Sequence, residues 1–386
     1  MRQVRHAVLG AVGLVMVGCA DRAEGPMLPV VAEPAPLLAA HGKAVEGQYI
    51  VVLREGGNPR AVAAVAGVNP RYVYEHALLG FAAELTPGQL RALQANPHVE
   101  YVEEDQVMEV VATQSNATWG IDRIDQRNRP LSGTYTYNTT ASNVYAYVID
   151  TGLQANHTQF GGRAANVYDA FGGNGNDCHG HGTHVGGTIG SSTYGVAKAV
   201  RLRGVRVLNC SGSGTTSGII AGVDWVRQNR VNPAVANMSL GGGYSSSLNT
   251  AVSNLSNSGV FVAVAAGNSN ANACNYSPAS ASVAFTVAAS TSTDAKASYS
   301  NYGSCVDAYA PGSSITSTWI NGGTNTISGT SMAAPHVAGV AALYKATYGN
   351  VASSTIDSWI KNNATANVIS GNVSGTPNRL LFKSTL

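Results

Sequence analysis

The sequence predicts an α/β domain, a parallel sheet flanked by helices, preceded by a small ferredoxin-like α+β unit. Between residues 143 and 290, nearly continuous apolar runs alternate with helical segments, and runs apolar on both faces are typical of parallel strands covered by helices. Residues 48–110 follow the order strand, helix, two strands, helix, strand, which is the split βαβ arrangement. The length of 386 residues also exceeds what one core usually serves, so two folded units are expected.

The composition indicates a compact exported protein. Apolar residues make up 44% and charged residues 11% of the chain, the formal net charge is only +2, and there are 44 glycines. Disordered chains combine few hydrophobic residues with high net charge, so disorder is excluded. No block of Lys and Arg is present, which excludes nucleic acid as a partner. Residues 1–111 carry a net charge of −4 and residues 112–386 one of +6, so the two parts are expected to attract each other.

Residues 1–20 have the pattern of an export signal, with Arg2 and Arg5 before an apolar run, Ala7–Val17, that is too short to span a membrane. Cleavage after Ala20 fits the small residues that precede it. Alternatively, residues 16–19 resemble a lipoprotein box, in which Cys19 would be acylated and hold the protein at the cell surface. Either route exports the chain. No later segment has about 18 consecutive apolar residues, so no membrane span is expected.

Residues 21–46 are rich in Pro and Ala and are interpreted as a linker. The small unit follows from residue 47 to residue 111. Its second helix has a clear start, because Thr86 and Gln89 form a capping box and Pro87 occupies the first helical position. A unit of this size is expected to be only marginally stable when it folds on its own.

The larger unit, residues 112–386, contains the predicted parallel strands, at residues 143–150, 198–208, 234–240, 259–268 and 282–290. Each of these runs ends in polar or glycine residues. In open parallel sheets, ligands bind outside the carboxyl ends of the strands. This rule directs attention to Asp150, Gly241–Gly243 and Asn268.

Four cysteines follow the leader, at positions 178, 210, 274 and 305. In an exported chain an even number indicates disulfides, and four cysteines allow three pairings. Sequential pairing would close loops of similar size, each stabilising by about 3 kcal/mol in the chain-entropy model. The alternative is a zinc site, because Cys178, His179, His181 and His184 lie within seven residues. That run lacks the paired spacing of zinc sites.

Three further segments carry chemically useful side chains. Asp150 ends a strand, His181 lies near the start of a helix rich in small residues, and Ser331 lies at the start of a helix that continues through residue 349. Pro335 is expected within the first turn of that helix, where N–H groups lack intrahelical acceptors. Singly, these residues could be a capping Asp, a structural His and an N-cap Ser. Together they supply an acid, a base and a nucleophile.

The blocks DTG (150–152), GHGTHVGGT (180–188) and GTSMAAPHVAG (329–339) resemble the three signature blocks of the subtilisin-like serine proteases, most closely the proteinase K and aqualysin branch. The resemblance covers nearly the whole chain, since residues 48–110 resemble the inhibitor-type propeptide of that branch. It implies an exported serine endopeptidase, made as an autoprocessed precursor whose propeptide inhibits it. It also implies sequential disulfides, cleavage between Val111 and Ala112, and a monomer.

The resemblance assigns a role to each candidate. Ser331 would attack the peptide carbonyl, His181 would take and return the proton, and Asp150 would orient the imidazole. Asn268, with the Ser331 N–H, would bind the oxyanion. Residues flanking the bound polypeptide would be Ser211, Gly212, Ser213 and Gly214 on one side and Ser239, Leu240 and Gly241 on the other. The pocket before the scissile bond would be lined by Ala265, Ala266, Gly267 and Gly241, so aromatic or aliphatic side chains are expected there.

Structural calcium is the cofactor that the resemblance implies. Asp307, with the carbonyls of Ser282 and Ala284, would form one site. Asp122, Asp125 and Gln126 would form a second. The sequence departs from the branch there, since Ser132 and Thr134 stand where relatives have acidic or amide ligands, so the second site is expected to be weakened or empty.

Two other functions compete with a serine protease. One is a catalytically inactive fold used for binding, which the presence of Asp150, His181, Ser331 and Asn268 disfavours. The other is a zinc hydrolase built on residues 178–184. A serine-directed fluorophosphonate would abolish casein hydrolysis only by a serine protease, and a zinc chelator would abolish it only for a zinc hydrolase.

Overall fold

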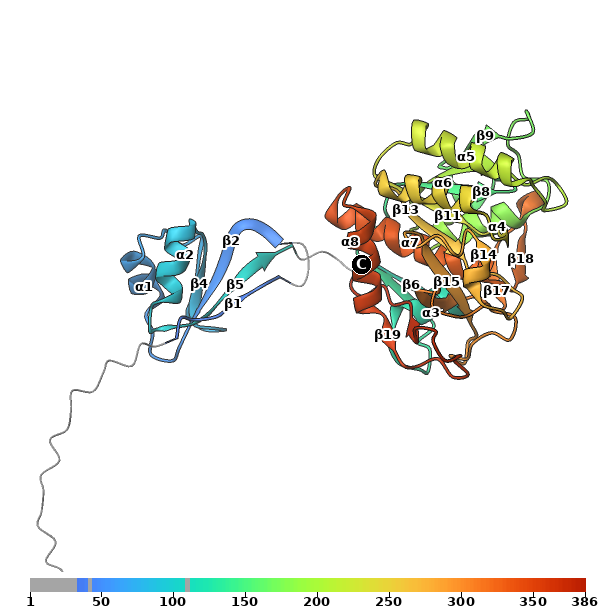
Figure 1. Cartoon of the computed structure of the whole chain (residues 1–386). Helices are drawn as coiled ribbons and strands as arrows, with labels where there is room; N and C mark the ends of the chain where they lie inside the picture. Colours follow the sequence, from blue (N-terminus) through green and yellow to red (C-terminus); the bar gives the residue numbers. More distant parts are fainter. Residues whose placement is uncertain (1–32, 41–43, 108–111) are drawn as a thin grey trace, which may run out of the picture. The chain divides into compact units, whose positions relative to one another are not determined.

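The computed structural model describes residues 33–40, 44–107 and 112–386. The chain divides into two compact units, one ending at Gln106 and one beginning at Val107 (Figure 1). The predicted export signal with Arg2, Arg5 and Cys19, and the Val111 side of the predicted cleavage site, lie outside the described residues. In the part that is described, no helix is long and apolar enough to cross a membrane.

The first unit has the predicted ferredoxin-like order. Its sheet has the strand order β1-β5-β2-β4-β3, and Val51, Phe81, Leu93 and Val102 are buried in its core. The predicted capping box is present, because Thr86 Oγ1 accepts from Gln89 N and Gln89 Oε1 accepts from Thr86 N. The elements are β1 (Leu37–Leu38), β2 (Ala44–Leu53), α1 (Pro59–Val65), β3 (Tyr72–Tyr74), β4 (Gly80–Glu84), α2 (Pro87–Gln94) and β5 (Val99–Gln106).

The prediction of a linker over residues 21–46 is wrong for the carboxyl-terminal part of that range. Strand β1 pairs in parallel with β5, and β2 already begins at Ala44. Ala35 is only 5% exposed, and its N–H donates to the carbonyl of Gln94 at 2.7 Å. The Pro and Ala residues indicated a linker, but Ala35 is small enough to pack in the core and the two leucines extend the sheet edge.

The second unit is built on a nine-stranded sheet with the order β19-β20-β16-β15-β13-β11-β8-β10-β9. All five predicted strands are present and parallel to their neighbours. Strands β9, β16, β19 and β20 were not predicted, and β19 pairs antiparallel with β20. The strands are β8 (Tyr145–Asp150), β9 (Ala165–Asp169), β10 (Arg201–Arg206), β11 (Ala234–Met238), β13 (Phe261–Ala265), β15 (Phe285–Ser290), β16 (Ala308–Pro311), β19 (Thr365–Ala366) and β20 (Arg379–Leu380).

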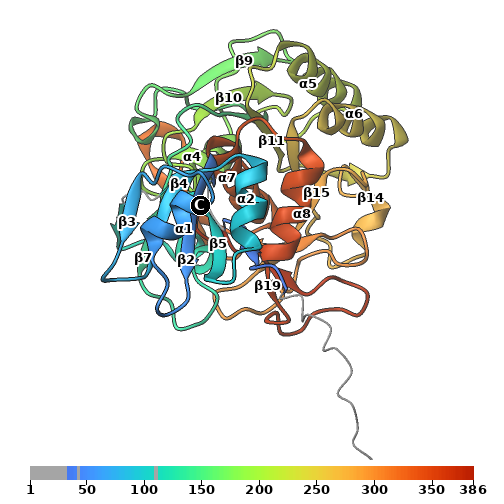
Figure 2. The ribbon, with the colours of Figure 1, turned by 90° about the vertical axis from the view of Figure 1, so that its left-hand side faces the viewer.

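Helices cover both faces of this sheet, as the doubly apolar strands predicted. Along β8, Ala146 and Val148 belong to one buried cluster with residues of α4 and α7, whereas Tyr147 and Ile149 belong to another with residues of α5 and α6. Helices α5 and α6 run side by side in both views (Figures 1 and 2). The helices are α3 (Trp119–Asp125), α4 (His181–Gly190), α5 (Thr216–Asn229), α6 (Ser246–Asn257), α7 (Thr330–Tyr348) and α8 (Ser353–Asn363).

Shorter elements complete the second unit. Three two-stranded pairs join β6 to β7, β12 to β14 and β17 to β18, and both disulfides follow the sequential pairing, Cys178–Cys210 and Cys274–Cys305. The strands are β6 (Ala112–Ser115), β7 (Thr134–Tyr137), β12 (Gly242–Gly243), β14 (Tyr276–Ser277), β17 (Ile315–Thr318) and β18 (Thr324–Ile327), and the 3-10 helices are η1 (Thr158–Phe160), η2 (Ala273–Asn275) and η3 (Ile320–Gly322).

Candidate active site

A buried carboxylate and an imidazole meet where β8 ends and α4 begins. Asp150 is fully buried, and its Oδ1 lies 2.8 Å from His181 Nδ1. The same oxygen accepts from Thr151 N at 2.7 Å, while Oδ2 has no hydrogen-bond partner among the residues that the structure describes. With Nδ1–H donating to the carboxylate, Nε2 of His181 is left as the basic atom of the ring.

The electrostatics distinguish His181 from His184 and His336. Burial lowers the pKa of His181, but the charge and hydrogen bond of Asp150 and the charge of Asp177 oppose it, and the pKa is raised overall. Burial lowers the pKa of His184 and that of His336 to about 4. A base with an opposite charge beside it can hold a proton during a reaction, and His184 and His336 cannot do so near neutral pH.

The start of α4 is fixed by Asp177, which the sequence analysis did not single out. Its carboxylate accepts from the backbone N–H groups of His179, Gly180 and Thr183, each at 2.9 Å. It also accepts from the hydroxyls of Thr183 and Thr151. Carboxylates satisfy the free N–H groups at a helix start, so an Asp shortly before the predicted helix was the available signal.

Ser331, the predicted nucleophile, lies in the first turn of α7. Its Oγ donates to the carbonyl of Ser239 at 3.2 Å, and no hydrogen bond joins it to His181 among the contacts of the described residues. Ser331 and His181 nevertheless line one cavity of about 470 Å³, together with the predicted flanking residues Ser211–Gly214 and Ser239–Gly241. The structure therefore pairs Asp150 with His181 and brings Ser331 to the same cavity.

The expected position of Pro335 in the first turn is wrong, because α7 begins at Thr330 and Pro335 is its sixth residue. Proline has no N–H to donate to the carbonyl four residues earlier, that of Ser331. Ser239 supplies the missing donor, since its Oγ bonds to the Ser331 carbonyl at 2.7 Å. The helix therefore tolerates Pro335 one turn further in than expected.

Two N–H donors, from the Asn268 side chain and the Ser331 backbone, lie near the same position beside Gly329. Asn268 Nδ2 and Ser331 N lie 3.5 and 3.6 Å from the position that a Cβ on Gly329 would occupy. The amide orientation of Asn268 is fixed because its Oδ1 accepts from Thr330 N and Thr330 Oγ1, at 2.8 and 2.9 Å. Thr330 was missed as a functional residue, although it lies within the quoted block. The arrangement can stabilise a negative oxygen next to Ser331.

A second cavity, of about 250 Å³, adjoins these donors. It is lined by all four predicted pocket residues, Gly241, Ala265, Ala266 and Gly267, together with residues such as Asn268 and Ser331, and none of its lining residues is charged. Gly267 has a φ of +101°, and a Cβ there would lie 2.4 Å from Asn301 Nδ2. The fully buried Asn301 was also missed; it donates to Ala266 O and accepts from Ser269 N and Ala271 N. It thereby holds the wall of the pocket.

The zinc alternative has no geometric support. Cys178 is bonded to Cys210, and Nε2 of His184 bonds to the carbonyl of Ile315 at 3.0 Å. Over residues 33–40, 44–107 and 112–386, no group of three or more His, Cys, Asp or Glu side chains is arranged to hold a metal ion. The disulfide instead ties the segment before α4 to the loop that carries Ser211–Gly214.

The side chains predicted to bind calcium are engaged by groups of the protein. Asp307 accepts from Thr286 N and pairs with Lys361, and Asp125 accepts from Thr136 and pairs with Lys383. Asp122 accepts from Ser132 and from Gly133 N, and Gln126 Oε1 accepts from Ser132 N. Ser282 lines a surface cavity beside Lys361, and Ala284 is buried. Oxygens that already accept from N–H and ammonium groups do not fit a calcium ion at these positions.

Serine proteinases combine a serine, an imidazole paired with a buried carboxylate, and donors for an oxyanion. This chain brings such groups together at the ends of the strands of a parallel sheet. Residues 141–380 match the Subtilase family, and residues 60–111 match the family described as Peptidase inhibitor I9. The chain therefore belongs to the subtilase family of serine proteinases and carries an I9 inhibitor domain.

Similar proteins include an extracellular serine proteinase of Thermus sp. (strain Rt41A), 50% identical over 380 residues, 91% of this chain and 93% of that protein. Proteinase R of Parengyodontium album is 47% identical over 361 residues, 91% of this chain and 92% of the relative. Among solved structures, a cold adapted subtilisin-like serine proteinase is 55% identical with a TM-score of 0.69, covering 70% of this chain and all of the other. The predicted fold class is confirmed by this likeness.

Proposed function

We propose that Asp150, His181 and Ser331 are the catalytic triad of this serine endopeptidase. The observation that carries the assignment is the 2.8 Å contact between His181 Nδ1 and Asp150 Oδ1 at a cavity that Ser331 also lines. Each residue lies in a block of a chain whose family is established. Catalytic hydrogen bonds are often absent from ligand-free sites and form when substrate binds.

The geometry implies a definite sequence of steps. Ser331 Oγ leaves the Ser239 carbonyl and attacks the scissile carbonyl carbon, while His181 Nε2 takes the hydroxyl proton. Asp150 stabilises the imidazolium that forms. Asn268 Nδ2 and Ser331 N donate to the negative oxygen of the tetrahedral intermediate. His181 then returns the proton to the leaving amine, and water hydrolyses the acyl-enzyme by the same route.

The proposed substrate is an extended polypeptide lying between residues 211–214 and 239–241. These segments follow β10 and β11 and line the same cavity, so their backbone groups can pair with a strand of substrate. The neighbouring uncharged pocket favours aromatic or aliphatic side chains before the scissile bond.

The remaining proposals concern the precursor. Residues 1–20 direct export, and residues 47–111, which overlap the I9 match, inhibit the enzyme until the bond between Val111 and Ala112 is cut. Residues 112–386 then act outside the cell as a monomer; relatives named as extracellular enzymes favour secretion over a lipid anchor at Cys19. Structural calcium remains a prediction from the family resemblance, without support from the contacts at Asp307, Asp122 or Asp125.

The assignment is tested with the full-length chain and Ser331→Ala. The wild type is expected to yield a mature form starting near Ala112, to hydrolyse a peptide anilide with Phe before the scissile bond, and to lose activity with a fluorophosphonate. Ser331→Ala is expected to remain a full-length, inactive precursor. Ser313→Ala, which removes another hydroxyl of the same unit, is the control. A Ser331→Ala protein that processes and hydrolyses normally would refute the triad, and an inactive wild type would favour a binding function.

A further inference from the structure

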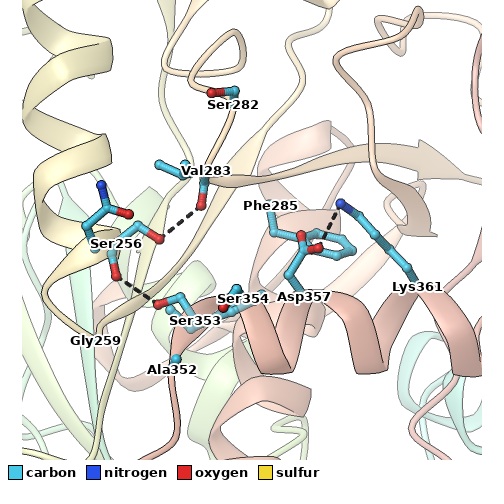
Figure 3. Close-up of a pocket in the computed structure, with 12 residues that line it drawn as sticks. Ser256, Gly259, Ser282, Val283, Phe285, Ala352, Ser353, Ser354, Asp357 and Lys361 are labelled. Atoms are coloured by element: carbon cyan, nitrogen blue, oxygen red, sulfur yellow. Dashed lines mark hydrogen bonds and ion pairs between the residues drawn. The ribbon is translucent and has the colours of Figure 1, made fainter.

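A lysine ammonium lies between two carboxylates at the first predicted calcium position. Lys361 Nζ is 2.8 Å from Asp307 Oδ1 and 2.9 Å from Asp357 Oδ2. Figure 3 shows Lys361 and Asp357 one turn apart on α8, with the ring of Phe285 beside them. The other oxygen of Asp307 accepts from Thr286 N at 2.7 Å. Asp307 follows a loop and immediately precedes β16, an inner strand of the main sheet, so the ammonium joins α8 to the amino end of that strand.

A second ammonium occupies the other predicted position. Lys383 is 2% exposed, and its Nζ lies 2.9 Å from Asp125 Oδ1 at the end of α3. It also donates to the carbonyls of Ser384 and Leu386, at 3.1 and 2.9 Å. One carboxylate and two carbonyl oxygens around a buried positive charge are the kinds of ligand that a hard metal ion takes. Here they surround a side chain of the protein.

We propose that the ammonium groups of Lys361 and Lys383 are built-in structural cations, which replace calcium at the two positions that the family resemblance predicts. Each one neutralises one of the predicted carboxylate ligands, Asp307 in the first site and Asp125 in the second. Each also ties the carboxyl-terminal part of the chain, α8 or residues 383–386, to an earlier element. A bound metal ion stabilises only the fraction of molecules that it occupies, whereas a lysine is always present. Folding at these positions therefore does not depend on free calcium.

The charge arrangement supports this proposal over an incidental surface pairing. Exposed ion pairs contribute little because water and salt screen them. Asp125 and Lys383 side chains are only 10% and 2% exposed, and Lys361 holds two carboxylates at once. Without the ammonium, the carboxylates of Asp307 and Asp357 would face each other unbalanced, and Asp125 would be a buried charge with hydrogen bonds from Thr136 alone.

The test measures thermal unfolding of the mature protein after treatment with a fluorophosphonate, in 10 mM chelator and in 10 mM CaCl₂. The wild type is expected to unfold within about 1 °C in the two buffers, whereas a site with a submillimolar Kd would raise the midpoint by roughly 5 °C or more. The variants Lys361→Met and Lys383→Met are expected to unfold several degrees lower in chelator. Lys296→Met, which removes a lysine paired with no carboxylate, is the control.

Two results would overturn the proposal. One is a calcium-induced rise in the wild type that Asp307→Asn or Asp125→Asn abolishes, because the metal would then bind where the lysines lie. The other is unchanged unfolding of both lysine variants. A rise that survives both Asp variants places calcium elsewhere and supports the lysine assignment. If Lys383→Met does not fold, the test uses Lys361→Met, because the Lys361 side chain is 27% exposed and its replacement is better tolerated. The readout is unfolding, so it is independent of whether the proposed triad is correct.

Discussion

The carboxylate of Asp177 accepts two hydrogen bonds from Thr183, one from its N–H at 2.9 Å and one from its hydroxyl at 2.6 Å. Asp177 lies four residues before His181 in sequence, and it also accepts from the N–H of Gly180, the residue that caps α4. The position of His181, the proposed base, therefore depends on a carboxylate that does not line the cavity shared by His181 and Ser331.

Asp177→Asn is expected to lower kcat by about 10- to 100-fold with little change in KM. The amide presents a donor where an acceptor is needed, so α4 and His181 shift, and small displacements cost this much. Loss of the negative charge also lowers the pKa of His181, because Asp177 raises it. The pH profile of kcat/KM should therefore move to lower pH, which a merely structural defect would not cause. Thr183→Ser, which keeps the hydroxyl, is the control; an unchanged pH profile would contradict the role.

Asn268→Ala is expected to lower kcat by about 10²- to 10³-fold and to leave KM nearly unchanged. The amide donor faces an oxygen that is negative only in the transition state, so ground-state binding is little affected. The measurement is steady-state hydrolysis of a peptide anilide, with Asn229→Ala on the exposed side of α5 as the matched control. A fall in kcat below fivefold would show that Asn268 is not an oxyanion donor.

The acid limb of kcat/KM is expected above pH 6.5. His181 acts as a base only when neutral. Burial lowers its pKa, but the charge and hydrogen bond of Asp150 and the charge of Asp177 together outweigh burial, so that the folded-state pKa lies above the ordinary value. Activity should therefore fall as the pH drops through that raised pKa. A pH series of kcat/KM at constant ionic strength measures the limb, and a midpoint well below 6.5 would contradict the electrostatic environment described here.

Stability is expected to fall steeply between pH 6.5 and about 4. Burial lowers the pKa values of His184 and His336 to about 4, so in this window the unfolded chain binds protons that the folded chain does not. The stabilisation is complete above pH 6.5 and is lost as the pH falls, by about 3 kcal/mol for each histidine. Urea unfolding of the inhibited enzyme at pH 7 and pH 5 measures the loss. Equal stability at both values would mean that these imidazoles are accessible to protons.

The double variant Cys178→Ser, Cys210→Ser is expected to lose about 3 kcal/mol of stability, because a closed loop of 32 residues is opened. The bond also joins the segment before α4 to the loop bearing Ser211–Gly214, so kcat/KM should fall at temperatures where the protein remains folded. Cys274→Ser, Cys305→Ser opens a loop of nearly equal length and is the matched control. Identical kinetics in the two double variants would show that the first disulfide has no influence on the cavity.

Much of the fold was predictable because the local pattern of apolar residues agrees with the burial of each strand in the folded sheet. The five apolar runs became parallel strands, and Asp150 and Asn268 lie just where the strand-end rule directed attention. Partners supplied by distant segments were not predictable. Nothing near Asp307 in sequence indicates that Lys361, 54 residues later, lies 2.8 Å away. Ala35 was assigned to a linker because its burial depends on a contact with the end of α2. Pro335 is tolerated deeper in α7 because Ser239, in the segment that follows β11, donates to the Ser331 carbonyl.

The reciprocal bonds between Ser239 and Ser331 set a resting state for the enzyme. One bond holds the backbone of Ser331 against the segment that follows β11, and in the other the Ser331 hydroxyl donates to the Ser239 carbonyl. When a peptide binds, only the hydrogen bond from the Ser331 hydroxyl needs to break. The net strength of such a bond is about 1 kcal/mol, which corresponds to about a fivefold change in the ratio of bonded to free hydroxyl. The hydroxyl of the proposed nucleophile is therefore restrained by one weak hydrogen bond, whereas its main chain is held by a separate bond that the proposed attack does not need to break.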